Sequence, residues 1–241
     1  MVTHETYKSA DGRWLSPGEI VRKGEVWIEE SSGNPATVGR IEKMSKSKKN
    51  TVDPEPIVDQ YGADAVRWFV LSDSPPERDL EWTENGIEGA WRFVQRLWRL
   101  FSQLSETGLE SWEGVDKPLD RVLHQTIAGV ASDIEGLQFN KAVAKLYALV
   151  NAIEKAPPSA SRAAAIRTII LLAAPMTPHL AEEAWAAMGN QGLIAEAEWP
   201  QVDPALLVED EVTIAIQVNG KLRDTVKAAK GEAKDALEAM A

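Results

Sequence analysis

The sequence predicts a mainly α-helical protein, in which a β-rich N-terminal segment precedes a helical bundle and the start of a truncated small α/β domain. Three observations predict this class. Short apolar stretches broken by turn signals fill residues 1–50. Apolar residues then recur at helical spacing as far as about residue 190, and an alternating strand pattern follows. We therefore expect three parts, made of residues 1–83, 84–205 and 206–241.

The first part begins with strands and ends with helices. Stretches such as EIVRKG and EVWIEE alternate with the turn signals ADGR and SSGNP, which is typical of short strands without a self-sufficient core. From Asp53 the pattern changes to that of a helix, which Asp-Pro starts and Gly62 ends. Val66 and Phe69 then follow at helical spacing. We expect two short helices here.

The strongest periodicity lies in ENGIEGAWRFVQRLWRLFSQLS, which starts at residue 84. Its large apolar residues step by four, three, four and three, and so predict one buried stripe made of Ile87, Trp91, Val94, Trp98 and Phe101. At about 100° per residue, the opposite face carries Arg92, Arg96 and Arg99. We expect the tryptophans of this region, Trp82, Trp91, Trp98 and Trp185, in the core.

Four more helical patterns complete the predicted bundle. They are PLDRVLHQTIAGVASDIE, FNKAVAKLYALVNAIE, SRAAAIRTIILLAA and PHLAEEAWAAMG, and PMTP separates the last two. His179 follows Pro178 at the start of the last helix, where we interpret it as a capping or packing residue.

The last part starts as a β-hairpin. Residues 212–218 alternate apolar and polar, and Asn219-Gly220 is the preferred dipeptide of a two-residue hairpin turn. KLRDTV predicts the return strand, and GEAKDALEAMA predicts a helix. A two-stranded hairpin with so short a helix cannot bury its own apolar face, so we expect a truncated domain.

Composition excludes several classes of protein. There is no cysteine, and the three histidines are scattered at His4, His124 and His179, so we expect no bound metal site. The sequence lacks a membrane-spanning apolar run and a signal peptide, which predicts a cytoplasmic protein with no membrane partner. A formal net charge of -11 opposes indiscriminate binding to nucleic acid, so local patches must meet any polyanion.

One such patch is the lysine loop, KMSKSKKN, at residues 43–50. A solvated loop is the ordinary interpretation of a lysine run. Here, however, Met44, Ser45 and Ser47 separate Lys43 from Lys46 and predict a mobile segment that can fold two ammonium groups over one ligand. Lysine is a compact point charge on a long stem, which suits it to stabilise a reacting phosphate and a departing pyrophosphate.

These residues also carry a family resemblance. KMSKS matches the second signature of class I aminoacyl-tRNA synthetases in all five positions, and KKNTVDPEPIVDQYGADAVRWFVL resembles the segment that follows it in the leucine, isoleucine, valine and methionine group. SPPERDLEWTENGIEGAWRFVQRLWRL, MTPHLAEEAW and QVNGKLR are most similar to bacterial-type leucyl-tRNA synthetases. The resemblance covers essentially the whole chain.

The resemblance implies ATP-dependent activation of leucine to leucyl-adenylate, followed by transfer to tRNA(Leu). It implies that Lys46 contacts the ATP phosphates with the help of Lys43, and that Met44, Ser45 and Ser47 complete the ATP-binding loop. Mg²⁺ accompanies ATP, and the complete enzyme is expected to be a monomer. The bundle corresponds to the anticodon-binding-type domain, which in the leucine enzymes does not depend on reading the anticodon bases.

The resemblance also implies an incomplete enzyme. The family's first signature needs two histidines three residues apart, and the histidines here do not have this spacing. The leucine pocket and the editing domain also precede the lysine loop in this family. We therefore expect a C-terminal fragment that is inactive without the N-terminal half.

Other interpretations stay open at this stage. Residues that could contact tRNA are also plausible as ordinary solvated charges, and they are Arg92, Arg96, Arg99, Lys221 and Arg223. The chain could be a stand-alone tRNA-binding or structural module derived from such an enzyme. It could also be a fragment of the isoleucyl or valyl enzyme.

Overall fold

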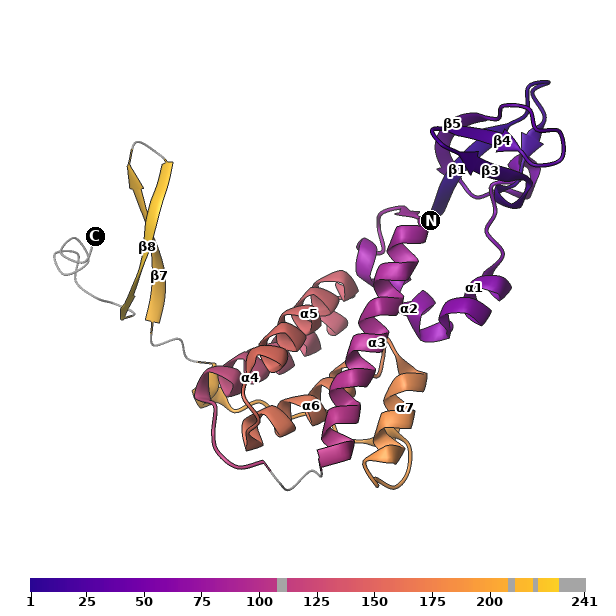
Figure 1. Cartoon of the computed structure of the whole chain (residues 1–241). Coiled ribbons are helices and arrows are strands. Elements are labelled where there is room, and N and C mark those ends of the chain that lie inside the picture. The colour runs from indigo at the N-terminus through magenta and orange to yellow at the C-terminus, as the bar shows by residue number, and fades with distance from the viewer. Residues whose placement is uncertain (108–111, 208–210, 219–220, 230–241) are drawn as a thin grey trace.

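Figure 1 shows a β unit, a helical bundle and a separate hairpin. The structure is a computed structural model, and it describes residues 1–107, 112–207, 211–218 and 221–229. The mainly α-helical class predicted from the sequence is confirmed. The predicted domain boundaries at residues 83 and 205 stay predictions.

The β unit is built around β1 (Val2–Lys8), which has partners on both sides. It pairs antiparallel with β2 (Trp14–Leu15) and β5 (Thr37–Lys43), and parallel with β6 (Leu80–Glu81). Between β2 and β5 the chain forms η1 (Pro17–Glu19) and an antiparallel hairpin of β3 (Ile20–Lys23) and β4 (Val26–Glu29). The small core of the β unit is made of Tyr7, Leu15 and Ile20, with Trp27 packed against it.

The two short helices predicted after the lysine loop are present. They are α1 (Pro54–Tyr61) and α2 (Ala63–Asp73), and the turn η2 (Lys46–Lys48) precedes them. The Asp53 side chain caps α1 by accepting from the Glu55 N–H, and Gly62 ends the helix at φ 84°. The chain therefore turns at Gly62 without the steric cost that a Cβ would add.

The bundle contains α3 (Glu84–Thr107), α4 (Lys117–Glu135), α5 (Phe139–Lys155), α6 (Ala160–Ala173) and α7 (Pro178–Ala187). The side chains of Asp116 and Ser159 cap α4 and α6. Two short turns follow, η3 (Ile194–Glu196) and η4 (Pro204–Leu206). One continuous apolar cluster runs through these helices and α2.

Helix α2 joins that cluster through Trp68, which is fully buried. The Trp68 ring stacks on Phe93 of α3 with a centroid distance of 4.5 Å. Its Nε1–H donates to the Tyr147 hydroxyl of α5 over 3.3 Å. Helix α2 is thus tied to α3 and α5 of the bundle.

The prediction that Trp91 and Trp98 lie in the core of α3 is wrong. Their exposed fractions are 39% and 37%. The side of α3 that faces the core carries Ile87, Ala90, Phe93, Leu97, Leu100 and Phe101. At about 100° per residue, both tryptophans lie at the edge of this stripe. Trp82 and Trp185 do pack against the core, as predicted.

The predicted hairpin consists of β7 (Glu211–Val218) and β8 (Lys221–Ala229), paired antiparallel with a register shift between Ile216 and Gln217. Its predicted turn at residues 219–220 and the predicted final helix lie outside the described residues. Within the described part of the chain, no helix combines the length and apolarity that crossing a bilayer requires.

Candidate functional site

The lysine loop starts where β5 ends and continues through η2. Its four lysines differ in their partners. Lys48 pairs with Glu42 of β5, and Lys49 Nζ lies 3.1 Å from Glu19 Oε2. Lys43 and Lys46 are exposed and form no ion pair with any described residue. Two ammonium groups are thus committed to the protein, and two are available to an anionic ligand.

A buried amide joins the two ends of the loop. Asn50 has no exposed surface, and its Oδ1 accepts from the Ser45 N–H over 2.8 Å. Its Nδ2 lies 3.3 Å from the His4 carbonyl oxygen of β1, 3.2 Å from that of Glu42 and 3.3 Å from that of Lys43. Sequence analysis did not single out Asn50, although it is the last residue of the lysine loop.

The tip of the loop is a short turn with few constraints. The Ser45 and Ser47 hydroxyl oxygens are 2.8 Å apart. The Lys49 N–H donates to the Lys46 carbonyl over 3.3 Å, and Lys49 has a left-handed backbone with φ 55°. Left-handed conformations are uncommon outside glycine, so the flanking contacts must hold this residue in place.

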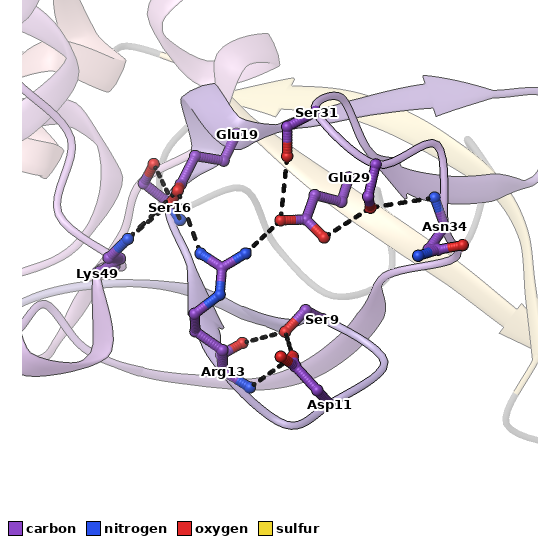
Figure 2. Close-up of polar contacts among 10 residues, drawn as sticks. Ser9, Asp11, Arg13, Ser16, Glu19, Glu29, Ser31, Asn34 and Lys49 are labelled. Atoms are coloured by element: carbon purple, nitrogen blue, oxygen red, sulfur yellow. Dashed lines mark hydrogen bonds and ion pairs between the residues drawn. The ribbon is translucent and has the colours of Figure 1, made fainter.

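Glu19 anchors the downstream end of the loop from the η1 turn. Figure 2 shows Lys49 and Ser16 converging on the Glu19 carboxylate, beside Arg13. The Ser16 N–H donates to Glu19 Oε2 over 2.8 Å, and Arg13 bridges Glu19 and Glu29. The hydrogen bond from Ser16, followed by that from Lys49, lowers the pKa of Glu19 to about 2. The carboxylate therefore keeps its charge well below neutral pH.

The three predicted arginines of α3 have different surroundings. Arg96 is largely covered, and its guanidinium donates to Glu154 and, over 2.6 Å, to Asn151 Oδ1. The hydrogen bond between Arg96 and Glu154 raises the pKa of Arg96 and lowers the pKa of Glu154. Arg92 is exposed, and its Nη1 lies 3.4 Å from Glu88 Oε2. Arg99 is exposed and forms no ion pair within the described ranges.

The other predicted site residues are only partly described. Arg223 is exposed on β8, whereas the side chain of Lys221 lies outside the described residues. In Figure 1, β8 lies apart from the strands of the β unit. Contacts between these residues and RNA stay predictions.

His179 lies at the start of α7, as predicted, but its side chain is exposed and does not cap the helix, so the predicted capping or packing role is wrong. Its Nδ1 lies 2.9 Å from Asp64 Oδ1, and the Leu180 N–H donates to Asp64 Oδ2 over 2.7 Å. Thr177 makes no side-chain capping bond, so the carboxylate from α2 caps α7 instead. Sequence analysis missed Asp64, because its partners are more than 100 positions away.

The cavity beside α7 does not provide a competing site for an anionic ligand. A partly open cavity of about 280 Å³ lies between α6, α7 and η3, but its lining of residues such as Leu171, Pro175 and Trp199 includes no cationic side chain. The described residues contain no group of three or more histidine or acidic side chains that could hold a metal ion. The lysine loop is therefore the best candidate for chemistry.

Comparisons with known proteins place this geometry in a family. Residues 37–83 match the family described as tRNA synthetases class I (I, L, M and V), and residues 116–238 match the anticodon-binding domain of tRNA ligase. The leucine-tRNA ligase of Rhizorhabdus wittichii is 69% identical over the whole chain, and that of Zymomonas mobilis is 60% identical. The chain belongs to the leucine-tRNA ligase family.

The chain spans 28% of the length of these two leucine-tRNA ligases. A solved structure supports the fold at lower identity. It is the ternary complex of a LeuRS from Agrobacterium radiobacter K84 with tRNA and LeuAMS, which is 30% identical with a TM-score of 0.68. The match covers 82% of this chain and 27% of that chain. Within the leucine-tRNA ligase family, the lysine loop falls inside the class I match, and α4 to α7 fall inside the anticodon-binding match.

Proposed function

We propose that this chain supplies the ATP-phosphate loop and the tRNA-binding helical domain of a leucine-tRNA ligase. In the first step, the leucine carboxylate attacks the α-phosphorus of ATP, the bond to the β-phosphate breaks, and leucyl-adenylate and pyrophosphate form. In the second step, the leucyl group passes to the terminal ribose of tRNA(Leu), and AMP leaves. We expect the chain by itself to be inactive.

The unequal pairing of the four lysines carries this proposal. Lys46 and Lys43 are exposed and have no carboxylate partner among the described residues, whereas Lys48 and Lys49 hold the loop to Glu42 and Glu19. In the first step, negative charge grows on the phosphorus centre and on the departing pyrophosphate. An oriented ammonium group stabilises that charge where it develops. Lys46 has the main role, Lys43 assists, and Met44, Ser45 and Ser47 shape the loop around the phosphates.

The helical domain is proposed to bind the tRNA backbone. Phosphate contacts need positive charge but no base edges, and Arg92 and Arg99 present such charge on the outer face of α3. Arg96 would contact tRNA only by giving up its bond to Glu154. Lys221 and Arg223 are proposed as further contacts from the hairpin.

Magnesium is proposed to arrive with ATP rather than in a site of this chain. Mg²⁺ that accompanies ATP is held largely by the phosphates and by water, so it needs no cluster of carboxylates in this chain. No step above depends on the metal. We further propose that the complete enzyme is monomeric and acts in the cytoplasm.

The experiment that tests this function uses a complete ligase in which these residues form the matching segment. ATP-pyrophosphate exchange is measured with leucine, isoleucine and valine, and charging is measured with tRNA(Leu). We expect exchange with leucine, charging of tRNA(Leu), and neither reaction with the isolated chain. Exchange driven by isoleucine or valine alone would favour those enzymes. Binding of tRNA without exchange would favour a stand-alone module.

A further inference from the structure

We infer that Asn50 is a positioning residue that clamps the two ends of the lysine loop and so sets where Lys46 stands. The inference rests on the proposed function, and it adds a residue that touches neither ATP nor tRNA. Asn50 is the only fully buried residue of the lysine loop. A buried amide at the end of an exposed cationic segment needs a physical reason.

The hydrogen bonds of Asn50 supply that reason. Its Oδ1 holds the Ser45 N–H, which is the last amide before the η2 turn. Its Nδ2 faces the carbonyl oxygens of Glu42 and Lys43 at the end of β5 and that of His4 in β1, all within 3.3 Å. One side chain therefore fixes the entry of the loop, its exit and the sheet beneath it.

The clamp limits the part of the loop that can move. Upstream, the Met44 N–H donates to the Val2 carbonyl over 3.2 Å. Downstream, Lys48 and Lys49 are held by Glu42 and Glu19. Between these anchors only Lys46 and Ser47 are exposed, and neither bonds to a residue outside the loop in the described part of the chain. Lys46 thus moves about a fixed base, and its ammonium group reaches one limited volume.

The side-chain amide of asparagine suits this place better than aspartate, alanine or glutamine. The clamp needs an acceptor for one N–H and donors toward the neighbouring carbonyl oxygens, and an asparagine side chain provides one acceptor and two N–H donors together. Aspartate keeps the shape but turns an acceptor toward the three carbonyl oxygens. Alanine removes both functions and leaves buried polar groups without partners. Glutamine adds a methylene group to a side chain that is already fully buried.

The test uses a complete ligase carrying this segment, with Asn50→Asp and Asn50→Ala as the two variants. Misplacing a catalytic charge by about 1 Å costs up to about 10²-fold. We expect kcat of ATP-pyrophosphate exchange to fall at least about tenfold, while KM for ATP changes less than about threefold. Hydrogen exchange of the segment containing Ser45 should accelerate. Asn190→Ala removes an exposed amide that bonds only to the Trp185 carbonyl, and this control should keep wild-type kinetics and exchange.

A double variant separates positioning from general destabilisation. If Asn50 acts through Lys46, then Asn50→Asp combined with Lys46→Ala should lose no more activity than Lys46→Ala alone. Losses that multiply would overturn the inference, and so would wild-type kcat in both Asn50 variants. Activity lost only in proportion to the unfolded fraction, measured by thermal denaturation, would also overturn it. If Lys46→Ala itself keeps full exchange activity, the proposed function fails instead.

Discussion

Lys46 and Lys48 lie two positions apart and carry the same charge, yet only one of them is free to bind a phosphate. Lys48 points its ammonium group at Glu42, and Lys46 has no ion-pair partner in the described ranges. An exposed ion pair contributes little to stability, but it does direct a flexible side chain away from other partners. The local pairing therefore assigns different roles to chemically identical residues.

Glu19 should titrate far below an ordinary glutamate. Its pKa is lowered to about 2, first by the Ser16 hydrogen bond and then by Lys49. A lowered folded-state pKa adds stability above the ordinary value of 4.5, and that stability is lost as the pH falls through about 2. The Glu19 carboxylate should thus stay charged and paired with Lys49 at a pH about one unit below the ordinary glutamate pKa of 4.5. A carbon-13 NMR titration of the Glu19 carboxyl group measures this.

Lys49→Met is the matched variant for that titration. It should raise the pKa of Glu19 only in part, because the larger contribution comes from Ser16. A midpoint near 4.5 in the unmodified chain would contradict the proposed anchor. So would an unchanged midpoint in Lys49→Met.

The sequence was sufficient to predict the two candidate ATP-binding lysines but not the partners of Lys48 and Lys49. Lys43 and Lys46 were recognisable from the spacing of KMSKS. Glu19 lies 30 positions before Lys49, in a segment whose turns have no periodic pattern, so their contact could not be predicted. The sequence shows only that Asn50 is a small amide at the end of the lysine loop. Its burial could not be predicted, because it depends on the fold of β1 and β5.

At the scale of elements, α3 shows where periodicity misleads. The spacing of its largest residues placed Trp91 and Trp98 at the centre of the buried stripe. The buried stripe is centred instead on Ala90, Phe93 and Leu97, each of which is at most 4% exposed. A tryptophan at the edge of a stripe can keep part of its ring on apolar neighbours and part in water, as Trp91 does beside Tyr61.

The contact between α2 and α7 should be a large local contribution to stability. Asp64 is buried and accepts from the Leu180 N–H and from His179. Asp64→Ala removes a charged cap and leaves buried donors unpaired, so we expect a loss of about 2 kcal/mol in the free energy of unfolding. Urea denaturation of the chain measures this loss.

His179→Ala is the control, because most of that side chain is exposed and the backbone bonds to Asp64 remain. We expect it to cost less than about 0.5 kcal/mol. An equally small effect of Asp64→Ala would show that the α2–α7 cap does not stabilise the bundle.

At the scale of the whole molecule, the net charge of -11 means that the proposed tRNA binding depends on local positive patches. Arg92→Gln with Arg99→Gln should weaken tRNA binding by the complete ligase and reduce the slope of log K against log salt by about two. Adding Arg96→Gln should change the slope less, because Glu154 already neutralises that arginine. Fluorescence titrations at several salt concentrations measure the slope. An unchanged slope would return these arginines to an ordinary solvated face.

The order of helices and strands could be predicted for most of the described chain, because each bundle helix has its own apolar period and its own start or stop signal. The packing of α2 into the bundle could not be predicted. The contacts of Trp68 with Phe93 and Tyr147 join residues far apart in the sequence, and local periodicity does not encode such contacts. Family resemblance supplied the role of the lysine loop, and the structure added its anchors.

ATP-pyrophosphate exchange by Lys46→Ala and Lys48→Ala variants of the complete ligase tests the central claim most directly. Removing one oriented charge should lower the exchange rate of Lys46→Ala about 10²-fold, with tRNA affinity unchanged within about twofold. Lys48→Ala should lose much less, because its ammonium group is bound to Glu42. Full exchange activity in Lys46→Ala, or the same loss in both variants, would contradict the assignment of the free lysine to the ATP phosphates.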